Sequence, residues 1–347
     1  MIVFTDKQSY GKAVWEAFIK HLGYMDENEI ILLVDNNSFP DYELPSNVRK
    51  IAYRNRFEAI KIILSYKKRR LFFLNVVDLF RFQFLKYIGR KLFVWHQGII
   101  PEESYSRHNS TLRYYILSVI EFLALRNADG AVLVSSEAKS FLERKYKFLS
   151  LKKCIVVPCL SDFSLTNISE PRDNKFVYIG GISPWQCFED VIASYLYIKN
   201  VIENATLSIY TLDKEKAKIT VEKFTSNYKE LGIEIASLTS RNEVEAALNN
   251  HRYGFLLRKN IPLNNVASPI KFGEYLSCGV APIITDAVID YAKIVREDGI
   301  GIISSKDKNT LVDDIKLFDK SPQEIYQSYR NRFNSQQIRK DYKWLLN

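Results

Sequence analysis

The segment 267–279, ASPIKFGEYLSCG, places a cation and a carboxylate at helical spacing. Ser268 is a predicted N-cap, with Pro269 as the first residue of a helix. Lys271 then lies in the first turn, where the helix dipole disfavours a cation unless an anion also binds. Glu274, three residues on, lies on the same face and can accept two hydrogen bonds from ribose hydroxyls. The spacing predicts an anion site; an internal Lys–Glu surface pair is the alternative.

Two further features that suit an anion follow predicted strands. Arg258 ends the strand FLLR, and Gly180 and Gly181 directly follow KFVYI. Glycines there let the backbone approach a phosphate, and the next helix N-terminus favours an anion. The motif is neither GxGxxG nor a P-loop, so a tight strand–helix turn is the alternative.

A third cluster, WHQGIIPEE, occupies 95–103. His96 follows a predicted buried strand and can hydrogen-bond to a substrate hydroxyl; a structural loop histidine is the alternative. Gln97, Glu102 and Glu103 are candidates for binding an acceptor, although the two glutamates also suit a solvated loop or a helix N-terminus. The four histidines are not at metal-ligand spacing, so we expect no metal site.

Short apolar runs alternate with amphipathic stretches, which predicts parallel sheets flanked by helices. The predicted strands are 1–4, 30–35, 70–76, 91–97, 130–136, 154–159, 175–182, 205–213, 233–238, 253–258 and 280–285. The predicted helices include 11–22, 110–126, 214–229 and 322–343. Ligands of such sheets bind beyond the carboxyl ends of the strands, where the three clusters fall.

The length of 347 residues predicts two domains. The polar stretch 160–172 separates two sets of strands and helices. We expect one Rossmann-like domain over 1–165, a second over 166–325, and a helix over 326–347 that crosses back to the first.

Positive charge is concentrated in the first half. Residues 1–165 hold 25 Lys and Arg against 17 Asp and Glu, a net of +8, whereas 166–347 hold 24 against 23. The region 49–91 mixes 13 basic residues with aromatics that we expect to be exposed. This suits an anionic lipid surface or nucleic acid, with a solvated helix face as the alternative. No helix-turn-helix, RNP or zinc-finger pattern is present, so we expect no nucleic-acid partner.

Other features of the composition point to a reducing compartment. The four cysteines include no CxxC pair, which favours a reducing compartment. Hydrophobic residues make up 47% of the chain, as in an ordinary globular protein. Asp6 and Lys7 interrupt the apolar start, so we expect no signal peptide, and no apolar run reaches 18 residues. We expect a cytoplasmic protein peripherally bound to the inner face of the cytoplasmic membrane.

The segments FVYIGGISPW…DVI and SPIKFGEYLSCGVAPIIT resemble the nucleotide-binding half of family-4 retaining glycosyltransferases. VWHQGIIPEES, ADGAVLVSSEAKSFLERKY and VVPCLSDF look like their acceptor half. The resemblance covers nearly the whole chain and is most specific over 271–279. It implies an α/β protein of the GT-B fold, with two doubly wound Rossmann-like domains facing a central cleft. Residues 1–165 would bind the acceptor and 166–325 the nucleotide sugar.

The resemblance also implies residue roles. Glu274 corresponds to the residue that binds the donor ribose, His96 lies near the donor sugar, and Gly11 lies where backbone amides approach the donor phosphate. The expected donor site comprises Gly11, Gly180, Gly181, Ser268, Lys271 and Glu274. The expected catalytic residues are His96, Lys271 and Arg258. No metal or cofactor is implied, because the nucleotide sugar is a co-substrate and the departing phosphate takes the acceptor proton in a front-face attack.

The implied enzyme is a hexosyltransferase of cell-surface polysaccharide synthesis (capsule, O-antigen or exopolysaccharide). It would move a sugar from a nucleotide sugar, a UDP-sugar being favoured, to a hydroxyl of a glycan or polyprenyl-linked acceptor. A GT-B epimerase, with Glu102 and Glu103 as its acids and bases, is a further alternative.

Two departures from the family pattern bear on this function. The family has Arg and Lys at the places of Gly181 and Gln186, and a glutamate at the place of Val266. Arg258 and Lys271 can supply the missing positive charge. Asn264 or Asn265 can replace the lost carboxylate. A CMP-linked donor with one phosphate, or a non-catalytic sugar-nucleotide binder, are the alternatives.

Overall fold

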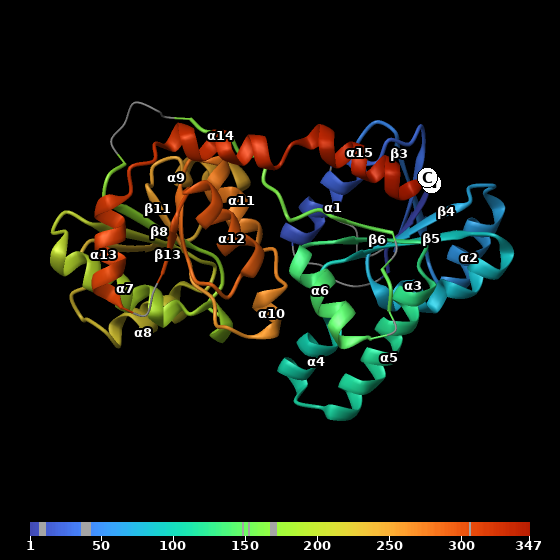
Figure 1. Cartoon of the computed structure of the whole chain (residues 1–347), viewed down its shortest axis with the longest axis horizontal. Helices are drawn as coiled ribbons and strands as arrows, with labels where there is room; N and C mark the ends of the chain where they lie inside the picture. Colours follow the sequence, from blue (N-terminus) through green and yellow to red (C-terminus); the bar gives the residue numbers. More distant parts are fainter. Residues whose placement is uncertain (7–11, 36–42, 148, 152, 167–171, 305–306) are drawn as a thin grey trace. The chain divides into compact units, whose positions relative to one another are not determined.

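A computed structural model of the chain describes residues 1–6, 12–35, 43–147, 149–151, 153–166, 172–304 and 307–347. It divides into two compact units (Figure 1). Unit 1 comprises Met1–Pro158 and Asn334–Asn347, and unit 2 comprises Cys159–Phe333. The units therefore change over at Pro158 and Phe333, where we expected residues 165 and 325.

The described residues of unit 1 form a parallel sheet in the order β3-β2-β1-β4-β5-β6-β7. Its strands are β1 (Ile2–Phe4), β2 (Ile30–Asp35), β3 (Val48–Tyr53), β4 (Arg70–Phe73), β5 (Lys91–His96), β6 (Gly130–Leu133) and β7 (Cys154–Val156). Its helices are α1 (Lys12–Tyr24), α2 (Arg56–Ser65), α3 (Val76–Phe82), η1 (Gln83–Ile88), α4 (Ile100–His108), α5 (Thr111–Asn127), α6 (Ser136–Lys145) and α15 (Ser335–Leu346).

The described residues of unit 2 form a second parallel sheet, ordered β10-β9-β8-β11-β12-β13. Its strands are β8 (Lys175–Ile179), β9 (Thr206–Tyr210), β10 (Ile233–Ala236), β11 (Tyr253–Leu256), β12 (Ala281–Ile284) and β13 (Ile302–Ile303). Its helices are η2 (Pro184–Gln186), α7 (Phe188–Val201), α8 (Lys214–Glu222), α9 (Arg241–Leu248), α10 (Pro262–Asn265), α11 (Ile270–Ser277), α12 (Ile289–Asp298), α13 (Lys308–Leu317) and α14 (Pro322–Arg332). The two parallel α/β sheets confirm the predicted fold class.

Strand β3 is absent from the prediction. Its sequence VRKIAY carries two adjacent cations, and only Tyr53 is fully buried because β3 lies at the edge of the sheet and pairs with β2 alone. An edge strand with a charged, solvent-facing surface lacks the continuous apolar run by which the inner strands were recognised.

The single helix predicted over 322–343 is two helices. Helix α14 ends at Arg332, and Asn334 caps α15 by accepting a hydrogen bond from the backbone N–H of Gln336. Helix α15 belongs to unit 1, where Tyr342 is buried. The apolar spacing continues through the break, so periodicity alone did not locate it.

The aromatic residues of 49–91 are of two kinds. Phe72, Phe73 and Phe82 lie in the core of unit 1, so the expectation that they are exposed is wrong. Strand β4 and helix α3 place them in the core because this sheet is covered on its faces by helices. Phe57 and Tyr87 are 79% and 90% exposed.

In the described part of the chain, no helix is long and apolar enough to cross a membrane.

Candidate active site

Lys271 and Gly180 meet at the carboxyl end of β8. Gly180 has a φ of +127°, and a Cβ atom built there would overlap Nζ of Lys271. The backbone conformation therefore favours glycine at this position, and a larger residue would also displace the end of the lysine side chain. The structure thus brings together two residues that lie 91 positions apart and that the sequence placed in separate clusters.

The Lys271 ammonium is buried and has no hydrogen-bond partner among the described residues. It lies 5.1 Å from the ring centroid of Tyr178, on β8. The Tyr178 hydroxyl donates to the carbonyl of Gly181 at 2.5 Å, and Oε1 of Gln186 lies 3.0 Å from the same hydroxyl oxygen. Tyr178 therefore supports the lysine and holds the turn after β8. Sequence reasoning missed it, since an aromatic in a strand gives no functional signal.

Arg258 brings a second buried cation to the neighbouring strand, β11. Its backbone N–H donates to Oγ1 of Thr285 at 3.0 Å, and that hydroxyl donates back to its carbonyl at 2.9 Å. Its Nη1 donates to the carbonyl of Leu257 at 3.1 Å. Within the described residues, neither Arg258 nor Lys271 forms a salt bridge. Burial lowers the pKa of Arg258 below its ordinary value.

The environment of Lys271 disfavours its charged form. Burial and then the positive charge of Arg258 lower its pKa to about 7, against the opposing effect of Glu274. Two buried cations that form no salt bridge among the described residues are expensive unless an anion binds. This is the chemistry that phosphate groups supply.

Helix α11 positions Glu274 one turn beyond Lys271, and the carboxylate is half-buried. Because the two residues are three positions apart on α11, they lie on the same face of that helix. The structure therefore assembles Gly180, Arg258, Lys271 and Glu274 at one edge of the unit 2 sheet.

The predicted N-cap at Ser268 is wrong. Pro269 is the N-cap residue of α11, and no side chain caps this helix. The Ser268 hydroxyl instead accepts from the backbone N–H of Cys159 at 2.8 Å and hydrogen-bonds to the Tyr291 hydroxyl at 2.6 Å. Since helix α11 begins one residue later than predicted, the serine lies too early to cap it. Its role in donor binding stays a prediction.

The two asparagines proposed to replace the family glutamate hold the chain around α10. Asn264 is buried, and its amide donates to the carbonyls of Lys259 at 2.7 Å and Trp185 at 3.2 Å. Asn265 donates to the carbonyl of Ala287 at 3.0 Å. These bonds use the amide hydrogens of the two side chains.

In unit 1, His96 ends β5 and is 2% exposed. Its Nε2 lies 3.1 Å from Oε1 of Glu121, a fully buried carboxylate on α5. Sequence reasoning missed Glu121. The available signal was a lone carboxylate in the apolar stretch ILSVIEFLAL.

The acceptor candidates lie on and beside α4. Oε1 of Glu102 is 2.8 Å from Nζ of Lys145 and accepts from the Tyr114 hydroxyl at 3.2 Å. Glu103 lies next to Gly98, where a Cβ would overlap its carboxylate, and burial raises its pKa. Gln97 donates to the carbonyl of Leu74 at 3.0 Å.

These contacts show which candidates share a neighbourhood. The electrostatic influence of His96 and Glu102 on Glu103 groups the carboxylates of α4 with the end of β5.

Gly11 lies outside the described residues. Among the residues that the structure describes, no three His, Cys, Asp or Glu side chains gather in a way that would hold a metal ion.

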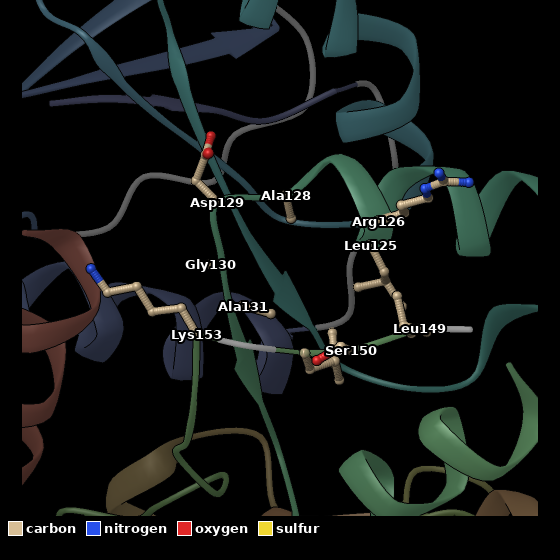
Figure 2. A pocket seen from close by; sticks show the side chains of 10 residues that line it. Leu125, Arg126, Ala128, Asp129, Gly130, Ala131, Leu149, Ser150 and Lys153 are labelled. Carbon is tan, nitrogen blue, oxygen red and sulfur yellow. The ribbon is translucent and has the colours of Figure 1, made fainter. Parts of the chain in front are cut away.

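A pocket of about 420 Å³ lies in unit 1 at the end of the sheet opposite to His96 (Figure 2). It is lined by Leu125, Arg126, Ala128, Asp129, Gly130, Ala131, Leu149, Ser150, Leu151 and Lys153. Gly130 begins β6, and Lys153 precedes β7, so the pocket is at the amino ends of these strands. His96 lies at the carboxyl end of β5, and this pocket therefore does not belong to the candidate site.

The topology of the two sheets is that of the GT-B fold found in glycosyltransferases. The solved structure of HepE from Anabaena in complex with UDP is 11% identical over 99% of both chains, with a TM-score of 0.71. Sucrose-phosphate synthase from Thermosynechococcus elongatus is 13% identical over 100% of this chain and 94% of that one, with a TM-score of 0.67. WaaG, a glycosyltransferase involved in lipopolysaccharide biosynthesis, is 10% identical over 99% and 98%, with a TM-score of 0.64.

A scan against protein-family models gives no match. A search of curated proteins gives none either. At 10–13% identity, the structural similarity establishes the fold.

Proposed function

We propose that the chain is a retaining glycosyltransferase that uses a nucleotide sugar. The observation that carries this proposal is the pair of buried cations, Lys271 and Arg258, which have no salt-bridge partner among the described residues. A nucleoside diphosphate supplies the missing negative charge. HepE was solved with UDP and with UDP-glucose, which favours a UDP-sugar as donor.

In this proposal, the leaving group is the nucleoside diphosphate. Negative charge grows on its terminal phosphate as the bond to the sugar breaks, and Lys271 and Arg258 stabilise that charge. The acceptor hydroxyl attacks from the same face and passes its proton to the departing phosphate. Glu274 binds the ribose and His96 lies near the sugar. No protein carboxylate is then required as a nucleophile.

The proposed acceptor is a glycan or polyprenyl-linked intermediate of a cell-surface polysaccharide. The involvement of WaaG in lipopolysaccharide biosynthesis favours this class. Glu102, Glu103 and Gln97 lie on or beside the end of β5 and are the proposed acceptor contacts.

The test is calorimetric binding of UDP, GDP, ADP and CMP to the full chain, followed by UDP release from UDP-glucose. Selective binding of one diphosphate together with turnover supports the transferase. Preference for CMP contradicts the diphosphate donor, and binding without any turnover supports a non-catalytic binder. These outcomes need to be separated because Gly181 and Gln186 stand where the family has an arginine and a lysine.

Replacing Glu274 by Ala should weaken UDP binding about 10-fold, since two hydrogen bonds from ribose hydroxyls to a carboxylate are lost. Calorimetry measures the dissociation constant. Glu297→Ala, on α12, removes an exposed carboxylate of the same unit and serves as the matched control. Equal UDP affinity in wild type and Glu274→Ala would remove the ribose role.

We also propose that unit 1 binds anionic membranes through the region 49–91. Its exposed apolar side chains are Phe57, Leu64, Phe84, Tyr87 and Ile88. Arg54, Lys61 and Lys67 lie near them along the chain and are exposed. Apolar and basic groups together suit an anionic interface, where each cation contributes about 1 kcal/mol.

Binding to vesicles that contain phosphatidylglycerol should weaken as salt rises, because the attraction is screened. Cosedimentation measures it, with neutral phosphatidylcholine vesicles for comparison. The double variant Tyr87→Ser/Ile88→Ser should bind less, whereas Leu317→Ser, which alters a residue 79% exposed on α13, should bind as wild type does. Salt-independent or absent binding would refute this surface.

A further inference from the structure

Helix α5 brings a carboxylate to the ring of His96. Glu121 is fully buried, and its two oxygens have different partners. Oε1 lies 3.1 Å from Nε2 of His96. Oε2 accepts from the Tyr146 hydroxyl at 2.7 Å and from Nζ of Lys145 at 3.2 Å. The carboxylate therefore links the end of β5 to the end of α6.

The two nitrogens of His96 are in different situations. Nε2 faces Glu121, whereas Nδ1 is buried and has no hydrogen-bond partner among the described residues. A proton on Nδ1 would be a buried donor with no acceptor, while a proton on Nε2 donates to a carboxylate. The neutral ring is therefore protonated on Nε2, and Nδ1 keeps its lone pair.

The surroundings keep Glu121 ionised. Burial acts to raise its pKa, but the hydrogen bonds from His96 and Tyr146 and the charge of Lys145 together hold the pKa below its ordinary value. Lys145 also pairs with Glu102 at 2.8 Å, so one ammonium is shared by two carboxylates. An ionised Glu121 accepts at both oxygens and has no proton to offer to the ring.

We propose that Glu121 is a positioning residue that fixes His96 as the Nε2–H tautomer and presents Nδ1 as a hydrogen-bond acceptor for a substrate hydroxyl. The location fits this role, because His96 ends β5 at the edge where parallel sheets bind ligands. A sugar hydroxyl would supply a hydrogen-bond partner for Nδ1, the ring nitrogen that has none among the described residues. The identity of the hydroxyl as part of a sugar rests on the proposed function.

The tautomer is measured directly by nitrogen NMR of the full chain labelled with ¹⁵N-histidine, at pH 8. The spectrum of His96→Asn identifies the His96 signals. His251 provides an internal reference of the opposite kind, since its Nδ1 lies 2.7 Å from the carbonyl of Ala247 and its Nε2 lies 2.9 Å from the Ser208 hydroxyl. We expect His96 to carry its proton on Nε2. A wild-type ring protonated on Nδ1 overturns the proposal, and this measurement needs no variant at Glu121.

Glu121→Gln tests the cause. Because Lys145 and Tyr146 both donate to Oε2, the glutamine keeps its amide oxygen on them and turns its NH₂ group toward His96. The ring must then accept at Nε2 and move its proton to Nδ1, as its NMR signals should show. An unchanged tautomer overturns the assignment. Glu143→Gln makes the same change at an exposed position of α6, and should leave the tautomer as in wild type.

Turnover provides the functional readout. Glu121→Gln should lower kcat/KM for sugar transfer about 10- to 100-fold, the effect of one hydrogen bond lost in the reacting complex. Its affinity for UDP should equal that of wild type, because Glu121 is not among the proposed nucleotide contacts and Arg258, Lys271 and Glu274 lie in unit 2. Unchanged kcat/KM contradicts the inference. Failure of wild type and variants alike to bind UDP contradicts the proposed function and leaves the tautomer measurement to decide on Glu121.

Discussion

Lys271→Met is expected to lower kcat for UDP release from UDP-glucose by about 10²- to 10³-fold, the cost of removing one preorganised charge from a leaving group. Methionine keeps the length and much of the volume of lysine, so the space beside Gly180 stays filled. The KM for the donor should change much less, since the negative charge that Lys271 stabilises is greatest as the bond breaks.

The control for this effect is Lys293→Met, on α12, where the lysine side chain is 73% exposed. Steady-state kinetics should find it unchanged. A kcat within about threefold of wild type in Lys271→Met would mean that this ammonium does not face the leaving group. Arg258 would then be the group that carries the charge.

The affinity for UDP is expected to fall as pH rises above 7. In the free protein, burial and Arg258 lower the pKa of Lys271 to about 7, so the ammonium is already losing its proton there. A bound phosphate favours the charged form and raises that pKa. Affinity is therefore highest below pH 7 and falls by up to about 10-fold per pH unit above it, until the pKa of the complex is reached.

Neighbouring groups do not titrate in this range. Burial raises the pKa of Tyr178 to about 12 and that of Cys187 to about 11, while Arg258 stays protonated even with a lowered pKa. The phosphate of UDP has lost its second proton by pH 7, since that pKa is about 6. Calorimetry between pH 7 and 9 measures the slope. Lys271→Met should show none, and an equally flat profile in wild type would contradict the assigned role.

Much of the architecture was predictable because inner parallel strands are buried on both faces and appear as continuous apolar runs. Gly180 and Arg258 were placed at strand ends for the same reason. The two residues come to the same end of the sheet because β8 and β11 are neighbouring parallel strands. The helix predicted over 110–126 corresponds to α5, which Ser110 caps by accepting a hydrogen bond from the backbone N–H of Arg113.

The errors have physical causes. Strand β3 was missed because its exposed cations interrupt the apolar pattern, and the cap at Asn334 was missed because the periodicity continues past it. The N-cap of α11 was predicted one residue too early. Ser268 does not cap the helix, and its hydroxyl instead hydrogen-bonds to Cys159 and Tyr291. Glu121 was not found, since its importance depends on how α5 packs against the end of β5, which no local spacing encodes.

The most direct measurement is a calorimetric comparison of uridine, UMP and UDP binding to the full chain at pH 7, in wild type and Lys271→Met. The central claim is that Lys271 and Arg258 hold the phosphates of a nucleotide donor. It predicts that UDP binds at least about 100-fold more tightly than uridine, since charge-assisted hydrogen bonds are worth about 1.5–3 kcal/mol each. Lys271→Met should erase much of that difference. Equal affinities for uridine and UDP, or no binding of UDP, would contradict the claim.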